Sequence, residues 1–136
     1  MHYETFDHEA DIGIRGFGGT IAEAFENAAV ALYSVMVNVH RVIPKERRIV
    51  KASAPDRELL LVEWLNALLS QSDIERMVFS KFEVKINGTS LIGTAWGEIL
   101  DRERHQAHVE VKGATYHMLS VQEREDGYVA QCVVDV

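Results

Sequence analysis

The sequence predicts an α+β fold in a single domain spanning residues 1–136, with two amphipathic helices packed on one face of a mostly antiparallel or mixed sheet of about six strands. Three observations predict this class. Two segments in the first half carry apolar residues at helical spacing, whereas the second half alternates polar and apolar residues with a period of two. Hairpin turn signals separate the alternating segments. A chain of 136 residues fits one domain.

The first half begins with a strand that we expect over residues 3–15, ended by the glycine-rich segment 16–19. Thr20 and Glu23 form a capping box, which predicts the start of a helix over residues 21–37. The apolar positions that recur at helical spacing in this helix are Ile21, Ala24, Phe25, Ala28, Leu32 and Val35.

A second helix follows a short strand over residues 49–54, and Asp56 is its expected N-cap. Its apolar stripe consists of Leu60, Leu61, Trp64, Leu65, Leu68 and Leu69. We expect Trp64 and Trp96 to be core aromatic residues.

The second half reads as strands. Alternation up to Asn87-Gly88 predicts a hairpin whose return strand covers residues 91–98. After a polar loop, a strand is expected near Tyr116, and a turn at Asp126-Gly127 leads into a last strand over residues 128–136.

Composition restricts the classes of function. The net charge is −7, with 21 acidic and 14 basic residues, so we expect no strong direct binding of nucleic acid. The basic run 45–48 with Lys51 is interpreted as a solvated face. The single cysteine, Cys132, indicates a reducing cytoplasm. We expect no membrane association, because no apolar stretch is long enough for a transmembrane helix and the N-terminus lacks the pattern of a secretory signal.

Polar residues that suit a metal gather at the two ends of the chain. Asp7, His8, Glu9 and Asp11 lie in the first strand, and the last residues are Asp135 and Val136. If the terminal strands pair, Asp11, Asp135 and the terminal carboxylate converge and repel one another unless a cation neutralises them. Oxygen ligands suit hard divalent ions. Taken alone, the same pattern is also typical of solvated strand ends.

The segment at residues 7–14, DHEADIGI, is similar to the Asp-His-Thr-Ala-Asp-(Ile/Val)-Gly-Ile motif of the archease family. The resemblance continues in order along essentially the whole chain. Its further segments are EAFENAA at residues 23–29, Leu59-Leu60, Trp64-Leu65-Asn66, FSKF at 79–82, Gly97-Glu98, Asp101, His105, EVKGATYH at 110–117 and Asp135-Val136. Two departures are Glu9, where the family often has Thr, and Gly113-Ala114, which replaces a usual Ala-Val; neither removes a candidate ligand.

The resemblance implies an accessory protein, not an enzyme, that activates a GTP- and metal-dependent RNA ligase in tRNA splicing and RNA repair. Such a protein promotes guanylylation and multiple turnover of its ligase partner. The resemblance also implies a divalent ion, Ca²⁺ in the first instance with Mg²⁺ or Mn²⁺ as alternatives, bound by Asp11, Asp135 and Val136.

Several histidines are weaker candidates. His8 stands three residues before Asp11, which on one strand places it on the opposite face; a structural role is expected. His105 and His108 have a spacing compatible with zinc, but the segment lacks a helical pattern. The family match suggests that Lys112, Thr115 and His117 form a surface used on the ligase or near the metal; structural packing is the alternative.

The sequence leaves two other functions open. One is a general chaperone, or a modulator of a tRNA methyltransferase, that acts through an apolar patch without a metal. The other is a metal-dependent hydrolase, which lacks a convincing base in this sequence. Lone Cys132 is expected to be buried and inert.

Overall fold

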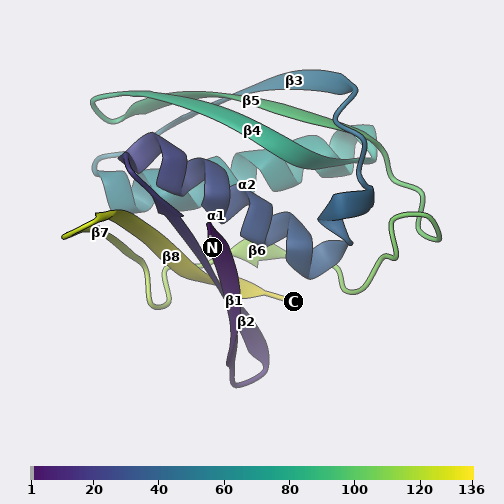
Figure 1. Cartoon of the computed structure of the whole chain (residues 1–136), viewed down its shortest axis with the longest axis horizontal. Coiled ribbons are helices and arrows are strands. Elements are labelled where there is room, and N and C mark those ends of the chain that lie inside the picture. The colour runs from purple at the N-terminus through teal and green to yellow at the C-terminus, as the bar shows by residue number, and fades with distance from the viewer. Residues whose placement is uncertain (1) are drawn as a thin grey trace.

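The computed structural model describes residues 2–136 and places two helices between two antiparallel sheets (Figure 1). Sheet A has the order β1-β2-β8-β6, with β7 also paired to β8, and sheet B has the order β3-β5-β4. The helices are α1 (Ile21–Met36) and α2 (Arg57–Glu75), with a short 3-10 helix η1 (Val39–Arg41). The strands are β1 (Tyr3–His8), β2 (Asp11–Gly18), β3 (Glu46–Ser53), β4 (Met77–Asn87), β5 (Ser90–Ile99), β6 (Gly113–Ala114), β7 (Ser120–Arg124) and β8 (Gly127–Asp135). The α+β class with two helices is confirmed.

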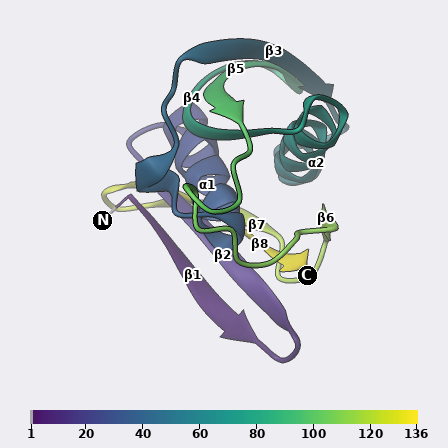
Figure 2. The same ribbon diagram turned by 90° about the vertical axis from the view of Figure 1, so that its right-hand side faces the viewer.

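The prediction that the helices lie on one face of a single sheet is wrong. Figure 2 shows the helices with strands on both sides, and α1 packs against β2 of sheet A and β4 of sheet B. Buried residues surround most of α1, including the pairs Ala24-Phe25 and Ala28-Ala29 and the run 31–33. A helix that is apolar on more than one side requires cover from more than one layer.

The predicted first strand, residues 3–15, is a hairpin instead. β1 and β2 pair in register from Tyr3 with Gly16 to His8 with Asp11, so the turn consists of Glu9 and Ala10. Glu9 adopts a positive φ of 53° without the glycine or asparagine that usually marks such a position. This turn therefore left no clear signal in the sequence.

Glycines in β2 allow α1 to approach sheet A closely. A Cβ atom on Gly16 would lie 2.2 Å from the backbone nitrogen of Ala28 and 2.3 Å from the carbonyl oxygen of Ala24. The Asn27 side chain reinforces this contact by donating a 2.6 Å hydrogen bond to the carbonyl of Phe17. The glycines thus position β2 directly against α1.

The predicted helix starts are confirmed. The Glu23 N–H donates to the Thr20 hydroxyl at 3.1 Å, and the Leu59 N–H donates to the Asp56 carboxylate at 2.8 Å. Helix α1 ends at Met36, one residue before the expected end.

The Asn87-Gly88 hairpin is confirmed with a shifted turn. Asn87 pairs with Ser90, so Gly88 and Thr89 form the two-residue loop, and of these only Gly88 has a positive φ. This is the pattern of a type II′ turn, not of the type I′ turn that Asn-Gly favours.

Three other predictions need correction. The strand expected over residues 49–54 covers Glu46–Ser53. The strand expected near Tyr116 is two strands, β6 and β7, on either side of that residue. Trp64 is fully buried, but Trp96 lies on the outer face of sheet B, in line with the exposed alternate residues of β5. No helix within residues 2–136 is long and apolar enough to cross a membrane.

Candidate functional site

The register of sheet A brings the two predicted aspartates to the same edge. β2 and β8 pair Ile12 with Val134, so Asp11 and Asp135 are the next residues outward on neighbouring strands. Alternate residues Ile14 and Val134 are fully buried against the helices. Because successive side chains on a strand point to opposite faces, Asp11 and Asp135 lie on the outer face of the sheet.

His8 lies on this outer face as well, which corrects the sequence prediction. His8 ends β1 directly opposite Asp11 in the hairpin register. Cross-strand partners share a face, whereas the prediction assumed an odd spacing along one continuous strand. A strand of residues 3–15 would have been much longer than the average of about 5–6 residues, and this length was the available warning.

His117 approaches the same row from the other side of β8. Its Nε2 lies 3.1 Å from the Nε2 of His8, and the ring centroids are 4.5 Å apart in an edge-on arrangement. One nitrogen must donate and the other accept, so the contact requires a lone pair on at least one of the two rings. Nδ1 of His8 is buried and has no hydrogen-bond partner within residues 2–136. No local pattern predicted that His8 and His117 touch, although the family match had suggested a place on the ligase surface or near the metal for His117.

The segment of residues 112–117 is held against β8 by backbone hydrogen bonds. The Lys112 N–H donates to the Asp135 carbonyl at 2.7 Å. Thr115 donates to the Val133 carbonyl through its N–H at 3.0 Å and through its hydroxyl at 2.7 Å. The Thr115 hydroxyl also accepts from the His117 N–H at 3.1 Å. Thr115 therefore orients His117, whereas the exposed Lys112 side chain remains directed to solvent.

The adjoining rows of the outer face form a rigid platform. A Cβ atom on Gly13 would lie 2.1 Å from the Phe6 ring, so the glycine of the DIGI motif makes room for that ring. The Arg15 guanidinium stands 4.5 Å from the Phe6 ring centroid, forms an ion pair with Glu4 and donates to Gln131 at 2.9 Å. These contacts fix the strands that carry the aspartates.

The predicted ligands at this edge offer only carboxylate oxygens, which suit a hard cation. Neither Asp11 nor Asp135 forms an ion pair with any described residue. Within residues 2–136, no three His, Cys, Asp or Glu side chains gather closely enough to hold a metal ion. The predicted set therefore consists of two side-chain carboxylates and depends on the Val136 carboxylate for its third ligand. We name Asp11, Asp135 and Val136 the acidic edge.

A second group of polar residues, the Glu98 cluster (Glu98, Arg104 and His105), lies at the end of β5. Glu98 is 2% exposed, and its carboxylate accepts hydrogen bonds from the Ile43 N–H at 2.8 Å, from Arg104 at 2.9 Å and from His105 at 2.8 Å. The Arg104 guanidinium, acting with the other two donors against the effect of burial, lowers the pKa of Glu98 to about 2.

His105 is fully engaged in this cluster. Its Nδ1 accepts from the Asp101 N–H at 3.0 Å, so Nε2 carries the proton that it donates to Glu98. Because both ring nitrogens are used, His105 has none left to share a zinc ion with the exposed His108. The spacing of His105 and His108, which is compatible with zinc, therefore does not form a zinc site.

Cys132 is fully buried, and burial raises the pKa of its thiol to about 12. The thiolate is the nucleophilic form of cysteine, so this residue is inert near neutral pH.

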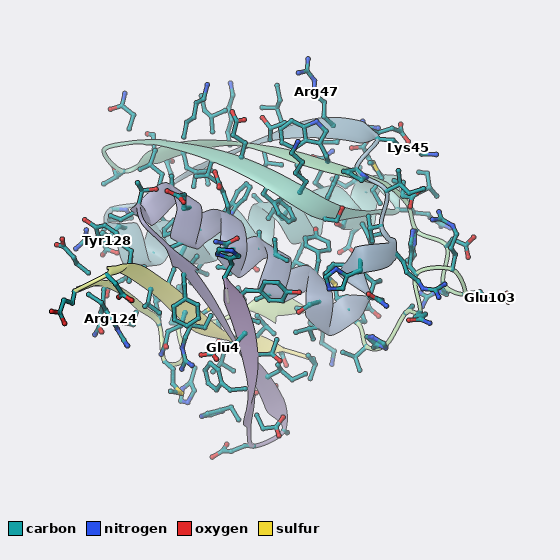
Figure 3. All side chains as sticks on the ribbon, in the orientation of Figure 1. Glu4, Lys45, Arg47, Glu103, Arg124 and Tyr128 are labelled. Carbon is teal, nitrogen blue, oxygen red and sulfur yellow. The ribbon has the colours of Figure 1, made fainter. Side chains whose placement is uncertain are left out.

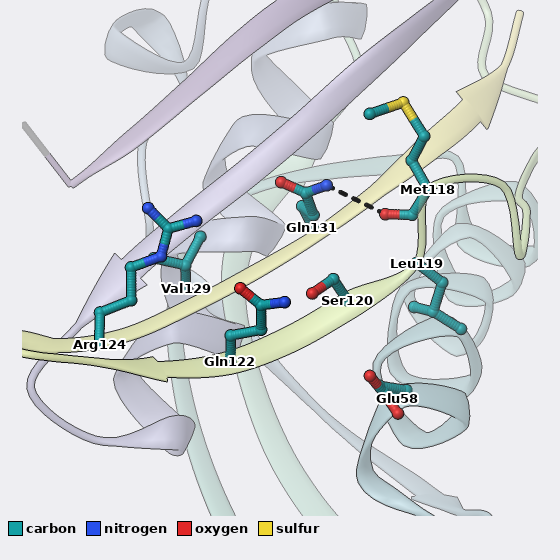
Figure 4. A pocket seen from close by; sticks show the side chains of 8 residues that line it. All are labelled: Glu58, Met118, Leu119, Ser120, Gln122, Arg124, Val129 and Gln131. Carbon is teal, nitrogen blue, oxygen red and sulfur yellow. Dashed lines mark hydrogen bonds between the residues drawn. The ribbon is translucent and has the colours of Figure 1, made fainter.

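A depression of about 440 Å³ lies along β7 and β8 near the start of α2 (Figure 4). The lining residues are Glu58, Met118, Leu119, Ser120, Gln122, Arg124, Val129 and Gln131. Gln131 closes one side by donating to the Met118 carbonyl at 3.1 Å. None of the predicted metal ligands lines this depression, so it is separate from the acidic edge.

Comparison with known proteins places these features in a family. Residues 3–136 match the archease protein family. The chain is 45% identical to the protein archease of Sulfurisphaera tokodaii over 136 residues and 46% identical to that of Pyrococcus abyssi over 139 residues, with 98% of each chain covered in both cases.

Solved structures agree with this. The solution structure of protein 1598 of Methanobacterium thermoautotrophicum has a TM-score of 0.86 at 39% identity, covering 98% of both chains. The crystal structure of an archease from Thermotoga maritima, described as a possible chaperone, shares the fold with a TM-score of 0.67 at 19% identity, covering 98% of this chain and 96% of its own. The chain belongs to the archease family.

Proposed function

We propose that this protein is an accessory factor that activates a GTP- and metal-dependent RNA ligase, and that it acts through a divalent ion held at the acidic edge. The observation that supports this proposal is the register of β2 and β8, which brings Asp11 and Asp135 together from opposite ends of the sequence. Two carboxylates without a cationic partner at neighbouring strand ends repel each other, and a bound cation removes that repulsion.

The proposed ligands are the Asp11 and Asp135 side chains and the Val136 carboxylate. Three anionic oxygen donors favour Ca²⁺, Mg²⁺ or Mn²⁺ over ions that prefer sulfur or nitrogen. When bound, the ion supplies positive charge at this edge for an anionic group of the partner. Asp11 and Asp135 bind and orient it, and the row of Phe6, Gly13 and Val133 behind them keeps the strand ends fixed.

His8 and His117 are proposed to shape the approach to the edge. Their contact links β1 to the segment after β6 across the same face as the aspartates. His8 is the cross-strand partner of Asp11, and its buried Nδ1 has no hydrogen-bond partner among residues 2–136. A hydrogen bond to this atom from a docked partner or an ion-bound water molecule requires the ring to turn outward on binding.

The test is an assay of ligase guanylylation and RNA joining with the cognate ligase. Asp11→Ala and Asp135→Ala are expected to lose stimulation, whereas Asp126→Ala, in the exposed β7–β8 turn, keeps it. If both edge variants stimulate as well as the parent protein, the mechanism through the acidic edge is wrong.

The third ligand has its own test. A tag fused after Val136 removes the free carboxylate and is expected to weaken Ca²⁺ binding, whereas a tag before Met1 leaves it unchanged. Equal affinities in isothermal titration calorimetry would remove Val136 from the site.

A metal-independent chaperone, or a modulator of a tRNA methyltransferase, is the second candidate. The observation that favours it is a set of exposed isoleucines; Ile43, Ile49, Ile92 and Ile99 are each at least half exposed. Exposed apolar groups of this kind bind partially folded chains or apolar partner surfaces. This function predicts that the protein suppresses aggregation of an unfolded client, and that adding a chelator does not change this suppression. A failure to suppress aggregation would exclude the general chaperone.

A further inference from the structure

The outer face of sheet B carries residues from three strands in regular rows. β5 lies between β3 and β4, so each outward residue of β5 has a neighbour on both sides. Trp96 stands between Arg47 and Lys81, Thr94 between Ile49 and Glu83, and Ile92 between Lys51 and Lys85. We name these nine residues the basic face.

The charge of the basic face is opposite to that of the whole protein. It contains four cationic residues, Arg47, Lys51, Lys81 and Lys85, and one anionic residue, Glu83, whereas the chain has a net charge of −7. Lys85 lies 4.0 Å from Glu83 and its side chain is 81% exposed, so this ion pair is weak. Arg48, the neighbour of Arg47, points to the helix side and binds Glu75 of α2 at 2.8 Å. Because successive side chains of a strand point to opposite faces, Arg47 and Lys51 belong to the basic face, whereas Arg48 binds α2.

The acidic edge does not cancel this charge in physiological salt. The acidic edge belongs to sheet A, on the other side of the helix layer (Figure 1). Two layers of packing place it roughly 20 Å away, whereas the Debye length is about 8 Å at physiological ionic strength. A ligand at the basic face is therefore screened from the charge of the acidic edge.

The face also presents an aromatic ring. Trp96 is half-buried, and the Lys81 ammonium stands 4.9 Å from its ring centroid. Arg47 projects from β3 into solvent, away from the helices (Figure 3). An aromatic ring surrounded by exposed cations on an open sheet is the arrangement with which proteins bind single-stranded nucleic acid, because bases stack on the ring and phosphates pair with the cations.

We propose that the basic face binds single-stranded RNA, with a base on Trp96 and phosphates on Arg47, Lys51 and Lys85. The choice of RNA over DNA rests on the proposed function as a ligase accessory factor; the polyanion with stackable bases follows from the face itself. Lys81 either stays on the ring or turns to a phosphate when a base takes its place. Since the basic face and the acidic edge lie on opposite sides of the helix layer, RNA and ligase can be bound at the same time.

Intrinsic fluorescence provides a direct measurement in the absence of ligase. The chain has two tryptophans, and Trp64 is fully buried, so quenching by RNA reports on Trp96. The probe is an unstructured oligoribonucleotide of about 12 nucleotides, within the usual site sizes of single-strand binders. Quenching is expected to saturate in the parent protein and to be absent in Trp96→Phe. Binding by the parent protein without a change in Trp96 emission would overturn the stacking assignment.

Salt dependence tests the ionic contacts. With three or four phosphates neutralised, raising salt from about 50 mM to about 200 mM weakens binding to a single strand by about 20- to 50-fold. An affinity that does not change with salt would contradict the proposal.

Charge reversal locates the site. The double variant Lys51→Glu and Lys85→Glu is expected to weaken RNA binding at least about tenfold, because both side chains are exposed and lie in one row. Arg124→Glu, in β7 of the opposite sheet (Figure 3), is the matched control and is expected to bind RNA nearly as well as the parent protein. An equal loss per reversed charge in the control would show that net charge alone governs binding, and would overturn the proposal.

A second outcome distinguishes the two proposals. If the parent protein binds no RNA but the double variant loses ligase stimulation, the basic face docks an acidic protein surface and the RNA proposal is wrong. Binding of RNA with unchanged ligase stimulation in Asp11→Ala and Asp135→Ala would instead support the basic face while contradicting the acidic edge.

Discussion

The acidic edge and the Glu98 cluster both contain carboxylates near a histidine, but they differ in whether those groups have hydrogen-bond and charge partners within the protein. In the Glu98 cluster one buried carboxylate receives three hydrogen bonds, and both ring nitrogens of His105 have partners. At the acidic edge, two aspartates have no cationic partner among residues 2–136, and the Nδ1 atom of the neighbouring His8 is buried without a hydrogen bond.

This difference suggests a structural role for the Glu98 cluster and a ligand-binding role for the acidic edge. The fully paired, buried Glu98 carboxylate ties the loop after β5 to Ile43, in the segment that follows η1, and it gains nothing from a ligand. Unpaired carboxylates at a strand end destabilise the isolated chain slightly, and a ligand of opposite charge relieves that cost. Family resemblance pointed to residues of both groups, Glu98 and His105 as well as Asp11 and Asp135, and the geometry assigns them different roles.

The largest expected effect is the loss of stability in Glu98→Gln. The neutral amide weakens the three hydrogen bonds that the buried carboxylate accepts from Ile43, Arg104 and His105, so the free energy of unfolding should fall by about 3 kcal/mol. Urea denaturation measures this, with Glu103→Gln, in the exposed loop, as the control. Ca²⁺ affinity should not change, and a loss of affinity would break the separation between the two regions.

Asp135→Asn should have the reverse profile. Mutating a residue that only supports a metal ligand typically lowers metal affinity by about 10- to 100-fold. Loss of a direct ligand should cost at least as much, so Ca²⁺ affinity should fall by about 100-fold or more. Stability without the ion should stay the same or rise slightly, because one of two like charges is removed. Calorimetric titration beside Asp126→Asn as the control measures the first effect; a variant that unfolds without the ion would instead place Asp135 among the structural residues.

Acid should weaken the Glu98 cluster in a defined window. The pKa of Glu98 is lowered from 4.5 to about 2 in the folded state, so the folded state binds this proton less readily than the unfolded state. Its stabilising contribution is therefore complete above about pH 4.5 and is lost as the pH falls towards about 2. Urea midpoints across this window should fall more steeply for the parent protein than for Glu98→Gln, and parallel curves would contradict the lowered pKa.

The smallest expected effect belongs to His117→Ala. Loss of the contact with His8 frees one side of the acidic edge without removing a ligand, so Ca²⁺ affinity should fall by about tenfold or less. Thr115→Val, which loses the hydroxyl that orients His117, should show part of the same effect. If ion binding falls as far in His117→Ala as in Asp135→Asn, His117 is itself a ligand and the set of three oxygens is incomplete.

Local patterns in the sequence predicted both helices, their caps at Thr20 and Asp56, and the hairpin at Gly88, because each depends on residues within a few positions of one another. The β1–β2 turn was missed because Glu9 carries a positive φ without a residue that favours it. That miss also placed His8 on the wrong face. Resemblance to a family predicted Asp11 and Asp135 as ligands, which spacing alone left open.

By itself, the sequence determined the class of fold, the positions of the helices and the presence of acidic residues at both ends of the chain. Only the tertiary structure decided that the strands divide into two sheets, that His8 and His117 meet beside Asp11, and that Glu98 is enclosed by Arg104 and His105. The same holds for the basic face, where β5 brings together four cations from β3 and β4 that are scattered in the sequence. The reason is that strand pairing joins residues that are far apart in the sequence. The alternation of polar and apolar residues predicts which face of a sheet a side chain occupies, but not which strand lies beside it.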